Sequence, residues 1–143
     1  RSTQGVSSAA SDVYKRQARH LGIKLVEVKE GYIKATMPVN DHTARPCTPV
    51  DILNGGASLA CAEIVSGYGS IVLCKEDEEP VGIQVSANHV GMTPVGEGRY
   101  VEARATIVHR GRTQHVWNVD IVTPEGKLIS TARITNLIIK KRS

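Results

Sequence analysis

One acidic side chain stands alone in the most apolar part of the sequence. Residues 54–74, NGGASLACAEIVSGYGSIVLC, contain a single charged side chain, that of Glu63. Desolvation disfavours the charged form of a carboxylate, so a carboxylate in such surroundings is costly unless it is paired or used. Glu63 is therefore a candidate general base or nucleophile. The alternative is a structural carboxylate, paired with a basic residue such as Arg133 or bonded to backbone amides.

A second candidate group is the backbone at Asn54, Gly55 and Gly56. The apolar segment predicts a helix, and the start of a helix offers free N–H groups and a partial positive charge, which suit an oxyanion. Glycine lets a ligand approach this backbone closely. Such a site could polarise a carbonyl group and stabilise the oxyanion that follows. The alternative is a glycine-rich helix start that serves tight packing.

The spacing of these two groups sets a constraint. Gly55 and Glu63 are eight residues apart, which on one helix means about 12 Å along the axis and about 80° around it. Neither group can then serve a reacting carbon that is held by the other. If both act in one site, Glu63 must come from a second copy of the chain, and the site lies at a subunit interface.

The elements around this segment predict an α+β fold. IKLVEVKE and YIKATMPV form a predicted hairpin across Glu30-Gly31, followed by an irregular loop over residues 40–51 and, after the helix, a solvated acidic turn over residues 75–80. Four β-like runs follow, at residues 81–90, 99–110, 115–122 and 127–140. Short turns between runs imply antiparallel neighbours. A surface helix would carry charges on its outer face, so we expect one buried helix, covered nearly all round, in an antiparallel sheet.

Composition and charge exclude several other classes of protein. The formal net charge of +4 comes from the two ends, since residues 1–19 and 140–142 each carry +3 and the rest sums to −2. A nucleic-acid-binding protein should show a basic face with stacking aromatic side chains, so no nucleic acid is expected. Residues 54–74 are long enough to span a membrane, but their Gly and Ser content and Glu63 argue against it. No membrane partner is expected.

The chain ends and the cysteines complete the outline. Residues 1–17 resemble translated adaptor sequence, so we predict a non-native or disordered leader followed by a single domain over residues 18–143. Cys47, Cys61 and Cys74 form neither a CxxC pair nor an even set, and we interpret them as free structural thiols in a reducing compartment. No secretory signal is evident, which predicts a cytoplasmic protein. No ligand cluster predicts a metal.

The helix segment resembles a known family. NGGASLACAE is similar to the HGGAS…AE signature of hotdog thioesterases, in the branch that contains phenylacetic-acid-pathway and 1,4-dihydroxy-2-naphthoyl-CoA thioesterases. The resemblance covers residues 18–139, with MPVNDHTARP before the signature and GIQVSANHV and HRGRTQHVW after it. It implies a hotdog fold, an antiparallel sheet wrapped around one long central helix. It also implies a homodimer or a dimer of dimers, with acyl-CoA as substrate and no separate cofactor.

The resemblance also assigns roles to residues. It implies Glu63 as general base or nucleophile and the Gly55 amide as the group that polarises the carbonyl. It places Ser66 and Gly67 near the acyl pocket. Near the coenzyme A arm it places Gly82, His89, His109, Gly111 and Arg112. The two histidines could instead be ordinary strand-surface residues, and the basic residues around Gly111 could form a phosphate site or a solvated turn.

Three departures from the family pattern concern the substrate. Asn54 replaces the usual His of HGG; an Asn can still donate a hydrogen bond to a carbonyl, but a protonatable group is lost. Thr48 replaces the family Gln and Val50 the aromatic residue, both at positions expected to hold the thioester or aryl group. We expect an aryl or related acyl-CoA thioester, with 1,4-dihydroxy-2-naphthoyl-CoA in menaquinone synthesis as the leading example. The alternatives are a hotdog enoyl-thioester hydratase and a non-catalytic acyl-CoA-binding protein.

Overall fold

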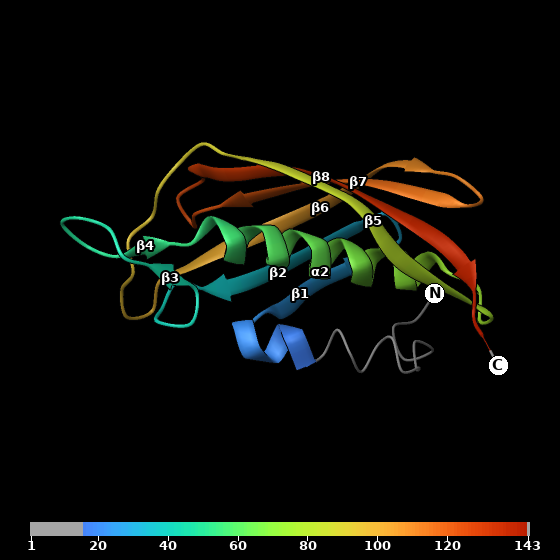
Figure 1. Cartoon of the computed structure of the whole chain (residues 1–143), viewed down its shortest axis with the longest axis horizontal. Helices are drawn as coiled ribbons and strands as arrows, with labels where there is room; N and C mark the ends of the chain where they lie inside the picture. The colour runs from blue at the N-terminus through green and yellow to red at the C-terminus, as the bar shows by residue number, and fades with distance from the viewer. Residues whose placement is uncertain (1–15, 143) are drawn as a thin grey trace.

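The computed structural model describes residues 16–142. A six-stranded antiparallel sheet, in the order β1-β2-β6-β7-β8-β5, carries one long helix, α2, along one face (Figure 1). The strands and the helix are β1 (Lys24–Lys29), β2 (Tyr32–Pro38), β3 (Ala44–Arg45), β4 (Ile52–Leu53), α2 (Gly55–Leu73), β5 (Glu78–His89), β6 (Tyr100–Arg110), β7 (Gln114–Val122) and β8 (Leu128–Lys140). Residues 16–21 are helical, and the rest of the predicted leader lies outside the described residues.

The predicted order of elements is confirmed, with two corrections. β1 and β2 pair across Gly31, whose φ of +85° is adopted without strain because glycine has no side chain. The acidic turn is shorter than expected, because Glu78–Pro80 already pairs with β8, and Pro80 is buried. The loop over residues 40–51 is also less irregular than its prolines suggest, since Ala44 pairs with Leu53 in the small β3-β4 sheet.

Helix α2 begins at Gly55 because Asn54 caps it. The Asn54 side chain accepts a hydrogen bond from the Gly56 N–H at 2.6 Å, and its backbone is extended. One side of the helix is buried against the sheet through residues such as Cys61, Val65 and Ser66. The prediction of a helix covered nearly all round holds for most of α2, of which 12 residues are buried. One stripe is open in a single chain, because Gly56 and Glu63 are exposed and the residues between them on that face are half-buried.

The core forms where inward side chains of the sheet meet α2. Alternate residues of each strand point inward, and Ile33, Ala35 and Met37 of β2 are fully buried. The Trp117 ring lies so close to Gly69 of α2 that a Cβ there would come within 2.5 Å of it. Glycine at this position therefore lets the helix approach the sheet closely.

A buried polar network fastens α2 to the sheet. The Ser70 hydroxyl accepts hydrogen bonds from Trp117 Nε1 and Asn136 Nδ2, both at 2.9 Å. Those two donors use the lone pairs of the oxygen, so the Ser70 O–H donates to His115 Nδ1, which lies 3.0 Å away. This bond requires a neutral His115 with its proton on Nε2.

The network predicts an acid-sensitive fold. Burial, with help from Arg110, lowers the pKa of His115 below its ordinary value of 6.5. On lowering the pH, His115 therefore binds a proton in the unfolded chain before it does so in the folded chain. The free energy of unfolding has its full value above pH 6.5 and falls as the pH drops below that value. In His115→Asn, urea unfolding should depend less on pH as the pH falls below 6.5. The exposed His42→Asn control should keep the wild-type slope; equal slopes in both variants would contradict the assignment.

Candidate active site

Glu63 lies on the outer side of α2, about two turns after the start of the helix at Gly55. Its carboxylate is exposed in a single chain, and among residues 16–142 it makes no ion pair. The alternative of a structural pairing with Arg133 is not found: that residue points to the outer face of the sheet, because its neighbours Ala132 and Ile134 are buried on the inner face. The Glu63 carboxylate is therefore in contact with solvent in a single chain, which does not provide the desolvation expected from the sequence. Gly82 of β5 lies beside the carboxylate, 3.6 Å from Oε2 to the position of a Cβ.

Gly55, at the start of α2, lies against His89. A Cβ at Gly55 would come within 2.7 Å of His89 Cδ2 and 2.8 Å of Nε2, so only glycine fits beneath the ring. The other ring nitrogen, Nδ1, is 3.0 Å from the buried Ser130 hydroxyl, which orients the imidazole. Asn54 occupies the Gly56 N–H, and no acceptor among the described residues takes the Gly55 N–H. This free amide can donate to an oxyanion.

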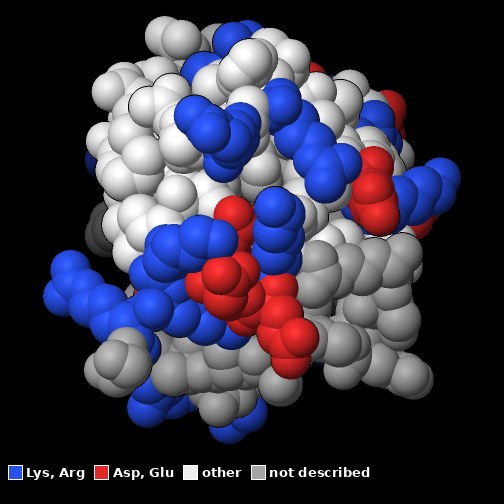
Figure 2. All heavy atoms as spheres, turned by 90° about the vertical axis from the view of Figure 1, so that its right-hand side faces the viewer, with Lys and Arg blue, Asp and Glu red and all other residues white. Residues whose placement is uncertain are grey.

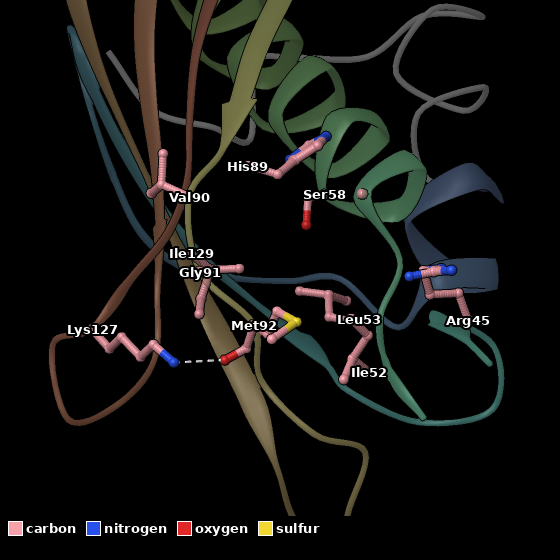
Figure 3. A pocket seen from close by; sticks show the side chains of 11 residues that line it. Arg45, Ile52, Leu53, Ser58, His89, Val90, Gly91, Met92, Lys127 and Ile129 are labelled. Atoms are coloured by element: carbon pink, nitrogen blue, oxygen red, sulfur yellow. Dashed lines mark hydrogen bonds between the residues drawn. The ribbon is translucent and has the colours of Figure 1, made fainter. Parts of the chain in front are cut away.

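The free amide borders a cavity of about 570 Å³. The cavity lies between the start of α2 and the segment after β5, with His89 and Ser58 on one side and Met92 and Leu53 on another (Figure 3). Most of its lining is apolar, contributed by Ile52, Leu53, Val90, Met92 and Ile129. Two basic side chains reach its rim, Arg45 and Lys127, and Lys127 Nζ donates to the Met92 carbonyl at 2.8 Å. A hydrocarbon or aryl group fits these walls.

The structure separates the two candidate groups. Helix α2 is unbroken from Gly55 to Leu73, so the sequence-derived separation of about 12 Å along its axis stands. Glu63 does not line the cavity beside Gly55. A single chain therefore holds two half-sites, one with a donor and a cavity, the other with a carboxylate.

Comparison with known proteins supplies the family. A family model described as the thioesterase superfamily matches residues 51–130. The chain belongs to the thioesterase superfamily. A 1,4-dihydroxy-2-naphthoyl-CoA hydrolase of Listeria monocytogenes is 30% identical over 122 residues, which are 85% of this chain and 94% of that protein.

Solved structures of thioesterases agree along nearly the whole chain. A thioesterase from Haemophilus influenzae superposes with a TM-score of 0.79 at 33% identity, covering 94% of this chain and 92% of the other. A single-site mutant of a Pseudomonas aeruginosa thioesterase gives 0.81 at 30%, covering 92% of each. The predicted hotdog fold is confirmed, and the protein is an acyl-CoA thioesterase.

Four other residues to which the resemblance assigns a role do not line the cavity beside Gly55. Thr48 and Val50 are exposed on the loop before β4 and do not line it. Ser66 and Gly67 are buried on the inner side of α2, and the Ser66 hydroxyl donates to the Glu63 carbonyl at 3.1 Å. No contact within one chain brings these four to a substrate, and their roles stay predictions.

The residues predicted near the coenzyme A arm fall into two groups. Gly82 and His89 lie on β5, at the two half-sites. The other three lie at the β6-β7 turn: His109 near the end of β6, and Gly111 and Arg112 in the turn itself, with the His109 ring against Gly111. This turn lies at the opposite end of the molecule from Gly55, and Figure 2 shows Lys and Arg side chains gathered at that end.

The thiols and possible ligands can be placed as well. All three cysteines are free, as predicted, and burial raises the pKa of Cys61 to about 12, which keeps it an unreactive thiol. Within residues 16–142 no three His, Cys, Asp or Glu side chains are grouped so that they could hold a metal ion.

Sequence reasoning missed Ser130 and Asn136, the side chains that position His89 and α2. A usable signal was present, because inward positions of β8 are otherwise apolar and these two polar residues interrupt that pattern. It also missed Arg45, Met92 and Lys127, which lie in short segments of sequence without a pattern that places them at the cavity.

Asn54 acts here as a helix cap, which predicts a stability effect. Asn54→Ala should lower the free energy of unfolding by about 1 kcal/mol, because the Gly56 N–H loses its acceptor. Asn54→Asp places a carboxylate oxygen where the amide oxygen of Asn54 stood, so the Gly56 N–H keeps its acceptor and the stability should be retained. Urea unfolding of the three proteins tests this, and an Ala variant as stable as wild type would refute the capping role.

Proposed function

We propose that this thioesterase hydrolyses an aryl or related acyl-CoA thioester, with 1,4-dihydroxy-2-naphthoyl-CoA of menaquinone synthesis as the leading candidate. The observation that carries the proposal is the apolar cavity that opens beside the free Gly55 amide. An aryl group would pack against Ile52, Met92 and Ile129, while its thioester carbonyl accepts a hydrogen bond from Gly55. The Listeria relative named above acts on that naphthoyl ester by its name, which supports the choice.

The proposed chemistry divides between two chains. Gly55 of one chain binds the carbonyl oxygen and stabilises the negative charge that develops on it. Glu63 of the second chain either takes a proton from water or attacks the carbonyl carbon. His89 Nε2 lies next to Gly55, oriented by Ser130, and can donate a second hydrogen bond to the same oxygen.

The edge of the sheet favours assembly through β5. This strand is hydrogen-bonded on one side only, to β8, which leaves a row of backbone groups unpaired. It is twelve residues long, and its Val81 and Ile83 are 41% and 51% exposed. The uncovered stripe of α2 lies beside it (Figure 1). A second copy of β5 would satisfy the edge and bury this apolar surface.

The inward and outward alternation of β5 is compatible with pairing about Ser86, the register that we propose. Gly82, Val85, Ala87 and His89 share the inner face, because they pair with inner residues of β8, and an extra residue at Ile83 makes a bulge. Antiparallel pairing about Ser86 sets Val85 opposite Ala87 of the second chain. Beyond the bulge, it sets Gly82 opposite His89. Glu63 of one chain then comes to the Gly55 half-site of the other.

The same pairing supplies a place for the coenzyme A arm. Antiparallel strands reverse the two ends of a chain, so the β6-β7 turn of one copy comes toward the Gly55 end of the other. Arg110 and Arg112 are exposed there and suit phosphate groups. We therefore propose a dimer with two symmetric sites, or a tetramer of two such dimers, in the cytoplasm.

The rival reactions fit less well. A hydratase needs a histidine paired with an acid, but His89 pairs with the hydroxyl of Ser130. A non-catalytic binding protein would have no need of an exposed carboxylate at Glu63.

The first test is release of free thiol from aryl, fatty and short acyl-CoA esters. Glu63→Gln should lower kcat by at least ~10²-fold on the best ester, the size of effect expected for a lost general base. Glu125→Gln, in the exposed β7-β8 turn, serves as the control and should match wild type. Turnover that is indifferent to Glu63, or the absence of turnover on every ester, would overturn the mechanism.

Shared sites predict complementation between two inactive chains. Gly55→Val drives a side chain into His89 and Glu63→Gln removes the carboxylate, so each homodimer should be inactive. Co-expressed with different tags and purified through both, the mixed dimer keeps one site with an intact Gly55 and an intact Glu63. It should recover about half of the wild-type activity per dimer. Mixed dimers as inactive as their parents would show that each site lies within one chain.

A further inference from the structure

Asn136 is a buried polar residue of β8 that lies against α2, close to Glu63. It is on the inner face of β8, directly opposite Gly82 of β5, and is only 1% exposed. Its Nδ2 donates to the Ser70 hydroxyl at 2.9 Å and to the Ser66 carbonyl at 3.3 Å. Both acceptors belong to α2, one and two turns beyond Glu63.

These contacts fix which way the side-chain amide faces. A backbone carbonyl can only accept a hydrogen bond, so the atom next to Ser66 O must be nitrogen. The Asn136 Oδ1 therefore points away from the helix axis, toward Gly82. No donor among the described residues bonds to Oδ1, yet the atom is not sealed off, since the structure has no fully enclosed side-chain oxygen without a partner.

The Asn136 oxygen and the Glu63 carboxylate face the same small space. A Cβ at Gly82 would lie 3.6 Å from Asn136 Oδ1 and 3.6 Å from Glu63 Oε2. The two oxygens are thus at most twice that distance apart, with the space between them left open by the glycine. Both are acceptors, so they cannot bond to each other without a donor between them. Water, with two O–H donors, has the required chemistry.

We propose that Asn136 positions the hydrolytic water, with Glu63 as its general base. Asn136 Oδ1 accepts one O–H of the water and Glu63 accepts the other. The water oxygen bonds to the thioester carbon as its proton passes to Glu63. The C–S bond then breaks, and that proton goes to the leaving sulfur, giving the acid and free coenzyme A. This assignment rests on the proposed function and chooses direct attack by water over a mixed anhydride.

Gly82→Ala tests the proposal with little structural disturbance. The added methyl makes ordinary van der Waals contacts and meets no positive φ, so the unfolding midpoint and the dimer mass should not change. It occupies the space of the water, and kcat should fall roughly 10- to 100-fold with KM nearly unchanged. Gln84→Ala is the matched control on the same strand; Gln84 pairs with Thr135, so it points to the opposite face.

A double-mutant cycle separates positioning from folding. Asn136→Leu removes the acceptor oxygen, and if both changes act through one water, the double variant should be no slower than the slower single variant. Losses in kcat that multiply would overturn the proposal, because they would mean independent effects. Should Asn136→Leu fail to fold, the cycle is run with Glu63→Gln, on which Gly82→Ala should then cost little.

The two levels of failure can be told apart. If Glu63→Gln abolishes turnover but Gly82→Ala and Asn136→Leu keep the wild-type kcat, the water site is wrong and the thioesterase mechanism stands. If no ester is turned over, or Glu63→Gln has no effect, the proposed function fails first.

Discussion

Helix α2 is continuous and holds the two groups that we propose as reactive, Gly55 and Glu63, at fixed positions. Its unbroken hydrogen bonding keeps Gly55 and Glu63 about 12 Å apart along the axis, and no side-chain movement closes that distance. Because one chain cannot bring the two groups together, the open surfaces beside them are important for the proposed site. In the described part of the chain, β1 and β5 are the edge strands of the sheet, and the exposed stripe of α2 lies beside the β5 edge.

The position of α2 on the sheet is set by polar rather than apolar contacts. Apolar side chains alone would let α2 slide or rotate with little loss, because their packing is weakly directional. Ser70 prevents this, since its hydroxyl joins Trp117, His115 and Asn136 from two adjacent strands. Gly69 beneath Trp117 permits the close approach that these bonds need. The network that stabilises the core therefore also determines where Glu63 stands relative to Gly82.

The sequence predicted what depends on periodicity and composition, and missed what depends on a partner. The central helix, its Asn54 start and the later strands followed from local patterns, whereas the role of Glu63, inferred from its isolation in an apolar segment, stays a prediction. The expected burial of that carboxylate was wrong, because an apolar helix face in an oligomer can be covered by another chain as well as by its own sheet. Cavity residues such as Arg45 and Met92 could not be predicted, since tertiary contacts alone bring them to the cavity.

The departures at Asn54, Thr48 and Val50 have one physical consequence in common. A His before Gly55 could titrate, whereas the Asn54 side chain cannot, and it caps the helix through the Gly56 N–H. Thr48 and Val50 are exposed in one chain and do not line the cavity. In the proposed mechanism, hydrolysis therefore depends on Glu63 of α2 and His89 of β5, while acyl selectivity depends on the cavity walls at Ile52, Met92 and Ile129. Changes in that lining would then alter the substrate without disturbing helix α2.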